Sequence, residues 1–307
     1  MNASSPSLEA AFEATRCLFC PEAPARELFP RRLDPARLGG YAFSARRQRT
    51  REHYRLVTCT GCGLVRSDPI LPEAVINRWY RESAFLFSGE AAFAATTYAA
   101  LLQRLRTSHP GASAIGSLCE IGCSTGFFME RCLEMGITDQ LGFEPSLQCR
   151  ERADPRVRDW IVPAPFTPEA AADRRFDLLA GFHVFDHLRD PRQALAQAAE
   201  LLNPGGFVLL VCHDVAAPLA RLLGRFNPIF DVEHIYLFST QTIARLLEAC
   251  GFQVLEIGAL GNTYPLAYWL RMAPGGRWLG ALVPEPLARR PVTLKAGNLY
   301  AFGRRRG

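Results

Sequence analysis

A short stretch near the middle of the chain combines glycines with an acidic residue in a pattern that suits nucleoside binding. Residues 118–128 read as a buried strand, a tight turn and the first turn of a helix. Glycines lack a Cβ, so a ligand or another backbone segment can approach closely. The acid stands at the carboxyl end of the strand, where open α/β sheets bind ligands. The candidate contacts in this stretch are Glu120, Gly122, Cys123, Ser124 and Gly126.

A second acid, Glu144, ends the next predicted strand at residues 140–144 and lies 22 positions beyond Gly122. This spacing suits a carboxylate that accepts hydrogen bonds from both ribose hydroxyls of a bound nucleoside. Strand, glycine turn, helix, strand and terminal acid therefore predict a nucleoside cofactor.

Two phosphate-binding motifs do not fit this stretch. The dinucleotide fingerprint needs glycines where the chain has Ser124 and Phe127. A P-loop needs a lysine, and the only lysine of the chain is Lys295. A nucleoside without phosphates is the better match.

Two Cys-x-x-Cys pairs near the N-terminus predict a structural zinc site. Thiolates two residues apart can turn onto one ion, and Gly61 permits a tight knuckle. The alternative is four unrelated buried thiols, as for the other six cysteines, which read as small apolar residues. The predicted ligands are Cys17, Cys20, Cys59 and Cys62.

Composition limits the class of protein. A chain of 307 residues can hold one large domain and a small appendage. It has no run of about 20 apolar residues, so we expect no membrane span. Residues 1–13 carry acids and lack the features of a signal peptide, which predicts a cytoplasmic, reducing location. The net charge of +5 is spread along the chain, so we do not expect nucleic acid as a partner.

The elements that must position these residues alternate between helices and strands, as in a doubly wound α/β sheet. Predicted helices cover 72–81, 90–107, 145–152, 190–202 and 239–250. Further predicted strands cover 157–162, 176–182, 207–212, 252–257 and 297–302, with a turn at 203–206.

The glycine stretch, followed by residues 142–146, resembles motif I and the second-strand acid of class I S-adenosylmethionine-dependent methyltransferases. The resemblance continues through residues 176–187, 202–206 and 249–252. It implies a doubly wound, seven-stranded, mostly parallel Rossmann-like sheet whose last strand is antiparallel. It also implies S-adenosyl-L-methionine as cofactor, with Pro145, Phe182 and His183 as further contacts.

The resulting domain prediction has three parts. Residues 1–70 form a small zinc-ribbon-like module, 71–112 a helical linker or cap, and 113–307 the methyltransferase domain with an insert at 261–296. The ribbon either binds nucleic acid or stabilises and covers the substrate, and we favour the second role. The insert is equally well explained as a lid over the acceptor or as a homodimer contact.

Catalytic candidates follow the predicted strands. Methyl transfer requires alignment of acceptor, methyl and sulfur, and often removal of one proton. Loop residues after two strands could serve, namely His183, Asp186, His187, His213 and Asp214. Glu233 and His234, which precede an aromatic-Ser helix start, resemble a pair in deoxysugar C-methyltransferases, which also carry an N-terminal Cys₄ zinc module. That resemblance implies that His234 acts as a base oriented by Glu233, whereas the alternative is that His234 only caps the helix.

The sequence thus predicts a methyltransferase that acts on a small-molecule or glycan-like acceptor, including a sugar. Two alternatives remain open: a zinc-ribbon methyltransferase that binds RNA, and a scaffold that binds the cofactor without catalysis.

Overall fold

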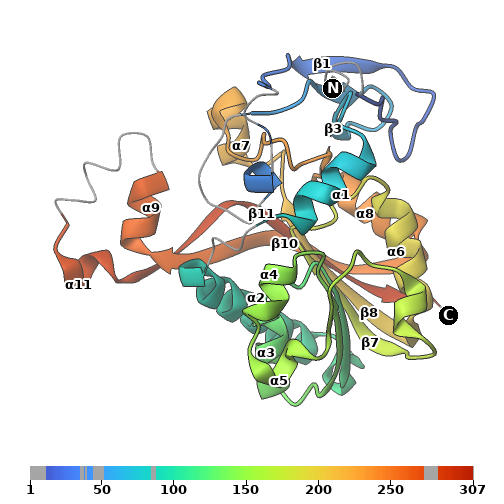
Figure 1. Cartoon of the computed structure of the whole chain (residues 1–307), viewed down its shortest axis with the longest axis vertical. Helices are drawn as coiled ribbons and strands as arrows, with labels where there is room; N and C mark the ends of the chain where they lie inside the picture. Colours follow the sequence, from blue (N-terminus) through green and yellow to red (C-terminus); the bar gives the residue numbers. More distant parts are fainter. Residues whose placement is uncertain are drawn as a thin grey trace, which may run out of the picture.

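A seven-stranded sheet forms the body of the molecule (Figure 1). The computed structural model describes residues 12–34, 38, 40–43, 52–83, 88–272 and 283–306. In spatial order the strands are β10 (Phe252–Pro265), β11 (Pro291–Arg305), β8 (Leu202–His213), β7 (Phe176–Phe182), β4 (Ser117–Ile121), β5 (Asp139–Phe143) and β6 (Ile161–Val162).

The sheet is parallel except at one strand. Strands β8, β7, β4, β5 and β6 pair in parallel, whereas β11 is antiparallel to both of its neighbours. The predicted doubly wound, seven-stranded sheet with an antiparallel last strand is therefore confirmed. From β4 the chain builds one side of the sheet through β5 and β6, and then the other side through β7 and β8. The gap between β4 and β7 is the topological switch point, where such sheets bind ligands.

Helices cover both faces of the sheet (Figure 1). The helices of the main domain are α2 (Ser88–Ser108), α3 (Phe127–Glu134), α4 (Leu147–Glu151), α5 (Pro155–Arg158), α6 (Pro191–Glu200), α7 (Pro218–Leu223) and α8 (Thr240–Ala249). Among the described helices, none is both long and apolar enough to cross a membrane.

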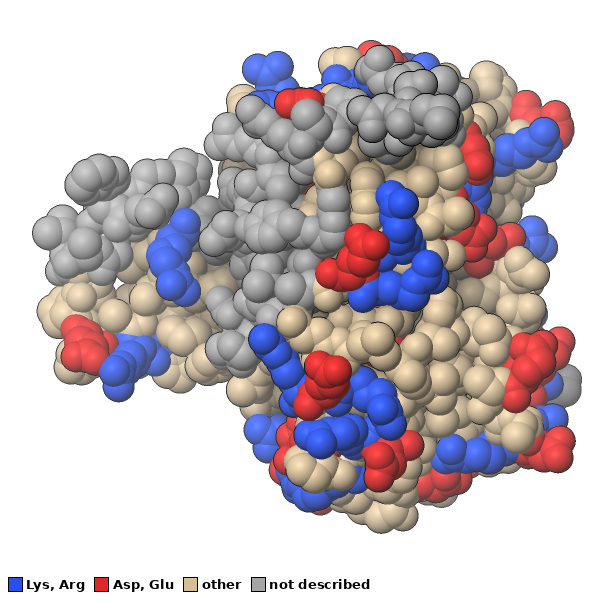
Figure 2. Space-filling view, viewed as in Figure 1, with Lys and Arg blue, Asp and Glu red and all other residues tan. Residues whose placement is uncertain are grey.

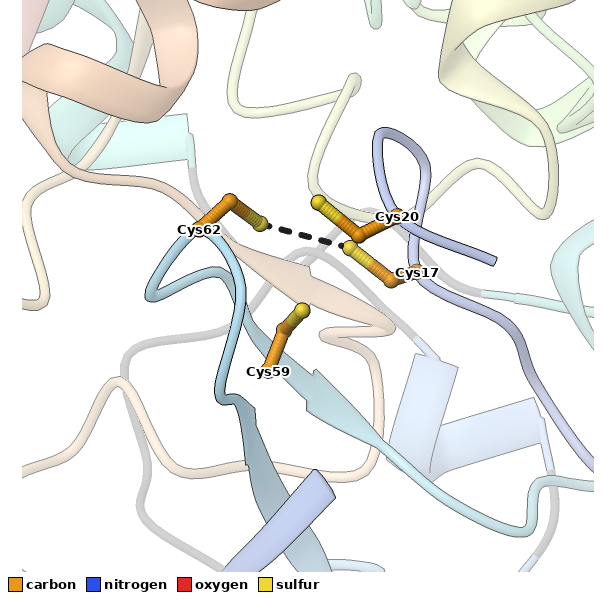
Figure 3. Close-up of side chains that lie close together, drawn as sticks. All are labelled: Cys17, Cys20, Cys59 and Cys62. Atoms are coloured by element: carbon orange, nitrogen blue, oxygen red, sulfur yellow. Dashed lines mark hydrogen bonds between the residues drawn. The ribbon is translucent and has the colours of Figure 1, made fainter. Parts of the chain in front are cut away.

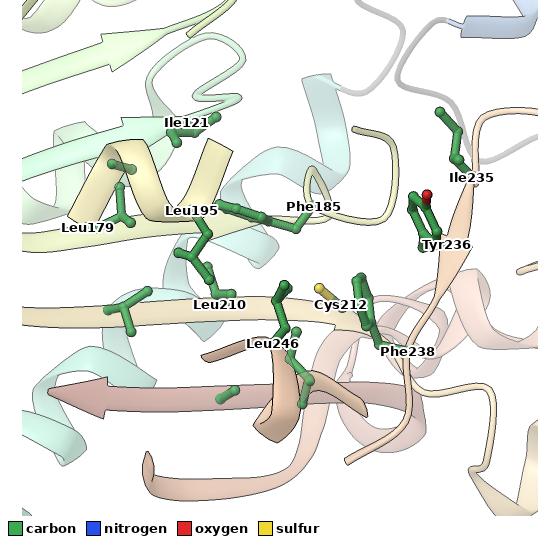
Figure 4. Close-up of a cluster of buried hydrophobic side chains, with 14 of the residues drawn as sticks. Ile121, Leu179, Phe185, Leu195, Leu210, Cys212, Ile235, Tyr236, Phe238 and Leu246 are labelled. Carbon is green, nitrogen blue, oxygen red and sulfur yellow. The ribbon is translucent and has the colours of Figure 1, made fainter. Parts of the chain in front are cut away.

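The core has two halves because successive side chains of a strand point to opposite faces. Leu179 and Leu210 pack with Leu195 of α6 and Leu246 of α8, as Figure 4 shows. The next residues back along the two strands, Leu178 and Leu209, pack with α2 and α3 on the other face. Side chains that alternate in this way leave both faces of the central strands buried, as parallel sheets require.

The N-terminal region forms a second sheet that includes a strand from far downstream. Its order is β1 (Ala25–Phe29), β2 (Leu56–Cys59), β3 (Val65–Ser67) and β9 (Tyr236–Leu237). Ser67 Oγ donates to the carbonyl of His234 at 2.7 Å, and Ser67 N donates to the Ile235 carbonyl at 2.8 Å. The division at residue 70 stays a prediction, and across it the chain forms one sheet and one continuous core.

Two predicted elements differ in the structure. Residues 157–158 of the predicted strand 157–162 belong to the helix α5 (Pro155–Arg158), and only Ile161–Val162 pair as β6. The reason is local: the Asp154 side chain caps the N–H of Arg156 and Pro155 takes the first helical position. The residues of the predicted turn at 203–206 form part of the strand β8, in which Gly205 has a φ of 72°.

The predicted insert at 261–296 is an extension of the last two strands. Strands β10 and β11 stay paired out to Pro265 and Pro291, so they form an arm that projects from the body (Figure 1). The arm carries α9 (Leu266–Met272) and α11 (Glu285–Ala288), and residues 273–282 of the insert lie outside the described part of the chain. The predicted helix 72–81 is α1 (Glu73–Arg81), and the predicted helix 90–107 is α2.

Gly122 holds the turn after β4 against a neighbouring loop, and this gives a stability prediction. Its φ is +73°, and a Cβ at this position would lie 2.9 Å from Val184 Cγ2. Gly136 has a similar φ of +83°, but nothing lies within 4 Å of its Cβ position. We expect Gly136→Ala to cost about 1–2 kcal/mol from backbone strain alone. Gly122→Ala should cost about 1–3 kcal/mol more from overpacking.

Chemical denaturation of the two variants and the parent protein measures this difference. Equal losses of unfolding free energy in the two variants would show that Val184 yields without cost.

Candidate functional site

A cavity of about 1050 Å³ opens at the switch point between β4 and β7. Its walls come from three parts of the sequence: the loops after the sheet strands, the N-terminal region with α1, and the segment before β9. The loops after the strands contribute Gly122, Ser124, Glu144, Pro145, Phe182, His183, His187 and His213. The N-terminal region with α1 contributes Cys17, Leu18, Phe19 and Tyr80. The segment before β9 contributes Asp231, Glu233 and His234.

Glu144 is held in place at the end of β5. Its Oε2 accepts a hydrogen bond from Ser124 N at 3.1 Å, and its Oε1 accepts one from Ser146 N at 2.9 Å. Burial raises the pKa of this half-buried carboxyl, and the N–H groups of Ser146 and Ser124 oppose that rise. The side chain lies on the cavity wall beside the glycine turn, where a carboxylate can receive ribose hydroxyls.

Two non-glycine residues of the wall have left-handed backbones. Ser124 has a φ of 52° and His183 a φ of 53°. Such conformations cost energy and persist where surrounding contacts fix them, often at ligand sites. His183 N donates to the Val211 carbonyl at 2.7 Å, which fixes the exit of β7.

Three of the predicted cofactor contacts lie behind the wall. Glu120 is 1% exposed, and burial, aided by the charge of Glu144, raises its pKa well above the usual range. The Cys123 side chain packs toward Gly142, and Gly126 faces Val157. The structure thus places Gly122, Ser124, Glu144, Pro145, Phe182 and His183 on the cavity and Glu120, Cys123 and Gly126 beneath it. All nine assignments as cofactor contacts stay predictions.

Aromatic side chains complete the middle of the cavity. The Tyr98 ring of α2 stacks on Phe182 with centroids 4.2 Å apart and planes at 5°. Tyr98 stands in the predicted helix 90–107 and was not among the residues that the sequence linked to the site. Because α2 is 21 residues long, only its docking on the sheet decides which turn reaches the cavity.

Four of the six histidines of the chain line the cavity and gather around a buried aspartate. The ring centroids of His183 and His213 are 4.5 Å apart, those of His213 and His234 5.0 Å, and those of His187 and His234 4.9 Å. Asp186 is fully buried, with His234 Nε2 3.8 Å from Oδ2 and His187 Nε2 3.9 Å from Oδ1.

Backbone hydrogen bonds fix the aspartate relative to the segment before β9. The Asp186 carbonyl accepts from Ile235 N at 2.8 Å and from Tyr236 N at 3.1 Å. Its carboxylate oxygens, in contrast, have no hydrogen bond of normal geometry among the described residues. These bonds hold the loop after β7 against the segment that carries His234, with an under-satisfied carboxylate between them.

Burial shifts the acid–base properties of this cluster. It raises the pKa of Asp186 to about 7, although the backbone N–H groups of Asp186 itself and of His213 act to lower that pKa. It lowers the pKa of His234 well below the usual range, and the neighbouring His187, His213 and His183 lower it further. The His234 imidazole is therefore neutral near pH 7.

Further polar groups hold the rings, and sequence reasoning missed them. The Tyr80 hydroxyl of α1 lies 3.1 Å from His187 Nδ1. Asn298 of β11 bridges two rings: its Oδ1 lies 2.9 Å from His213 Nδ1, and its Nδ2 lies 3.4 Å from His183 Nε2. Neither residue stands in a motif, so no local signal marks it.

The predicted catalytic pair lies on the cavity wall. The carboxylate of Asp186, which comes from another loop, lies 3.8 Å from His234 Nε2. The roles of His234 and Glu233 stay predictions.

The four N-terminal cysteines converge, as Figure 3 shows. Their sulfurs all lie within 4.8 Å of one another, and those of Cys17 and Cys62 are 3.4 Å apart. Sulfurs around a tetrahedral zinc ion, with Zn–S bonds of about 2.3 Å, are about 3.8 Å apart. Burial alone would raise the pKa of Cys59, but the N–H groups of Gly61 and Cys62 and the neighbouring thiols lower it to about 7. The site fits an ion that binds thiolates.

Comparison with known proteins decides the family. Residues 91–257, more than half of the chain, match the model of a methyltransferase domain family. The chain belongs to this methyltransferase domain family. The match includes the glycine turn, Glu144 and the histidine cluster, so the prediction of a methyltransferase is confirmed.

The matches to curated relatives cover only part of the length of each relative. The O-methyltransferase resE of Aspergillus sclerotiorum is 31% identical over 102 residues, which are 32% of this chain and 38% of the relative. A tRNA U34 carboxymethyltransferase of Pseudomonas fluorescens is 28% identical over 99 residues, which are 30% and 31% of the two chains. The matches thus span about a third of the length of these relatives.

Solved structures of similar shape include a possible histamine N-methyltransferase from Thermotoga maritima, with 21% identity and a TM-score of 0.44 over 72% of this chain and 93% of that one. Another is the plantazolicin methyltransferase BpumL bound to a substrate analogue and SAH, with 14% identity and a TM-score of 0.48 over 72% and 87% of the two chains.

Proposed function

We propose that the protein transfers a methyl group from S-adenosyl-L-methionine to a hydroxyl oxygen of a small-molecule acceptor. The observation that carries this proposal is the shared cavity, whose walls include both the glycine turn with Glu144 and the four clustered histidines. A donor site and a proton-accepting site in one enclosed space are what methyl transfer needs.

The donor end suits an adenosine. Glu144 is oriented by two backbone N–H groups, so it can accept hydrogen bonds from ribose hydroxyls without first reorganising. Phe182, stacked on Tyr98, supplies an apolar wall next to His183. The family match supports this choice of donor.

The acceptor end suits removal of a proton. A neutral His234 takes the proton of the hydroxyl as the methyl group moves from sulfur to oxygen, leaving a neutral thioether. Asp186 orients the imidazole in the role that the sequence assigned to Glu233, because Asp186 lies 3.8 Å from the ring. The relatives named O-methyltransferases favour an oxygen acceptor. The resemblance of the Glu233–His234 segment to deoxysugar C-methyltransferases keeps a sugar as the narrower acceptor class.

An RNA acceptor is a weaker candidate, suggested by the relative that acts on tRNA. Among the described residues on the face shown in Figure 2, lysine and arginine side chains lie beside aspartate and glutamate and form no continuous basic patch. RNA binding depends on such patches, so this face does not favour it.

The cysteine cluster, in this proposal, holds a structural zinc ion. Cys17 and the two residues after it also line the cavity, so the ion stabilises part of the cavity wall. The N-terminal module then covers the acceptor.

Loss of the ribose-binding carboxylate tests the donor site. Glu144→Ala should weaken S-adenosylhomocysteine binding about 100-fold, because hydrogen bonds to a charged acceptor contribute about 1.5–3 kcal/mol each. Isothermal titration calorimetry gives the affinities. Glu134→Ala, at an exposed position of α3, is the control and should bind as the parent does. Equal affinities in both variants would remove the basis for the donor site.

Loss of the imidazole tests the acceptor end. His234→Ala should lower kcat by about 10²–10⁴-fold, the usual contribution of general base catalysis, while cofactor affinity stays unchanged. The control is His109→Ala, since His109 pairs with Glu256 away from the cavity. Unchanged cofactor binding verifies that the His234→Ala variant is folded. Full turnover by this variant would contradict the role of His234 as the base.

Metal content tests the cysteine cluster. Cys59→Ser should contain one zinc equivalent less than the parent protein and melt at lower temperature, because metal binding contributes to folding. Elemental analysis after dialysis counts the ion, with Cys250→Ser, outside the cluster, as control. Identical zinc contents in all three proteins would contradict a zinc site here.

A further inference from the structure

The carboxylate of Asp186 lacks a counter-charge that its surroundings would require. It is fully buried, and no hydrogen bond of normal geometry reaches either oxygen from the described residues. A buried, uncompensated carboxylate costs several kcal/mol, so it either holds a proton or pairs with a cation. The groups closest to it are imidazole nitrogens, which bind cations as neutral donors.

We propose that Asp186, His187 and His234 bind a divalent transition-metal ion at the acceptor end of the cavity. Two imidazoles and one carboxylate are a donor set that proteins use for catalytic zinc and for iron(II). This inference rests on the proposed function and changes one part of it: His234 holds the ion instead of taking the proton directly.

The distances fit this assignment. Around a tetrahedral ion with bonds of about 2.0–2.1 Å, donor atoms lie about 3.4 Å apart. His234 Nε2 and His187 Nε2 lie 3.8 and 3.9 Å from the Asp186 oxygens, and the donor atoms of all three residues are within 4.8 Å of one another. Small side-chain rotations close the remaining few tenths of an ångström.

One of the two rings has an outer partner of the kind that metal-binding histidines use, whereas the buried Nδ1 of His234 has no hydrogen bond of normal geometry among the described residues. His187 Nδ1 lies 3.1 Å from the Tyr80 hydroxyl, which leaves Nε2 directed at Asp186. The backbone of Ile229 forms a polar contact with His234 that favours its protonated form and so acts against the effect of burial on its pKa. Such outer partners orient the ring and set which nitrogen carries the lone pair.

A second group, His183, Asp186 and His213, shares the same aspartate. In the first group, His187 Nε2 and His234 Nε2 lie 3.9 and 3.8 Å from the carboxylate oxygens of Asp186. His183 and His213 are instead bridged to each other by Asn298. The first group is therefore the better binding site.

The ion would have a chemical role in the proposed reaction. His187 and His234 line the cavity, so an ion held by the three residues would be accessible to an acceptor in the cavity. A hydroxyl oxygen bound there loses its proton more readily, as water does on catalytic zinc. The proton passes to the neighbouring His213, whose ring centroid is 5.0 Å from that of His234, and the methyl group then moves from sulfur to oxygen.

Cobalt(II) is the probe that separates this site from the cysteine cluster. The full-length protein is first loaded with one zinc equivalent and then titrated with cobalt(II). We expect one further equivalent, with visible absorption of a nitrogen–oxygen site and without the thiolate charge-transfer band that cobalt in the cysteine cluster would give.

Variants assign the ligands. Asp186→Asn and His187→Ala should weaken cobalt binding by more than 100-fold, and Tyr80→Phe by about 10-fold, as outer partners typically do. His109→Ala is the matched control and should bind as the parent does. S-adenosylhomocysteine binding by each variant verifies its fold.

Three results would overturn the inference: no second equivalent of cobalt in the parent protein, unchanged cobalt affinity in Asp186→Asn, or loss of cobalt binding in His213→Ala while His187→Ala retains it.

Failure of the metal site and failure of the proposed function give different results. Cofactor binding and turnover without a second ion refute only the metal site, whereas cobalt binding without cofactor binding refutes only the function.

Discussion

The parallel pairing of β4 with β7 is the constraint on which the site depends. The register places Ile121 opposite Gly181, so both strands end at the same edge of the sheet. Beyond this edge the segments that follow β4 and β7 diverge, because β5 continues one side of the sheet and β8 continues the other. Close packing at this point needs small residues: a Cβ on Gly181 would lie 2.7 Å from Phe185 Cε2. The cavity begins in the gap that results, between the glycine turn and the loop of His183.

A second pairing closes the cavity. Strand β3, directly after the cysteine pair of residues 59 and 62, pairs with β9, which begins two residues after His234. The hydrogen bonds of Ser67 continue this contact up to the histidine itself. The order of the cysteine cluster and the position of the acceptor end are thereby coupled through a few backbone hydrogen bonds. An N-terminal module attached in this way is part of the site and not a separate appendage.

The two ends of the cavity differ in how their carboxylates are satisfied. Glu144 accepts two backbone N–H groups and is held ready for a neutral ligand with hydroxyls. Asp186 is more deeply buried and has imidazoles near it in place of N–H donors of normal geometry. Unsatisfied buried charges are costly. The Glu144 carboxylate is already satisfied by its two hydrogen bonds, whereas the Asp186 carboxylate requires a proton or a cation. This contrast is the basis on which we propose that Glu144 recognises the donor and that the histidine cluster takes part in the reaction.

The sequence by itself determined the sheet, its order of elements, the glycine turn, Glu144 and the pairing of the four cysteines, because each depends on local patterns: strand–turn–helix succession, spacing of an acid, and Cys-x-x-Cys. It assigned the last two residues of α5 to a strand and predicted the last two strands too short, since hydrogen bonds between distant segments decide where strands extend. Only the tertiary structure placed Glu120 and Cys123 behind the wall, Tyr80 and Asn298 beside the histidines, and Asp186 next to His234. Those contacts join residues tens to more than a hundred positions apart, and no local pattern encodes which strand ends meet.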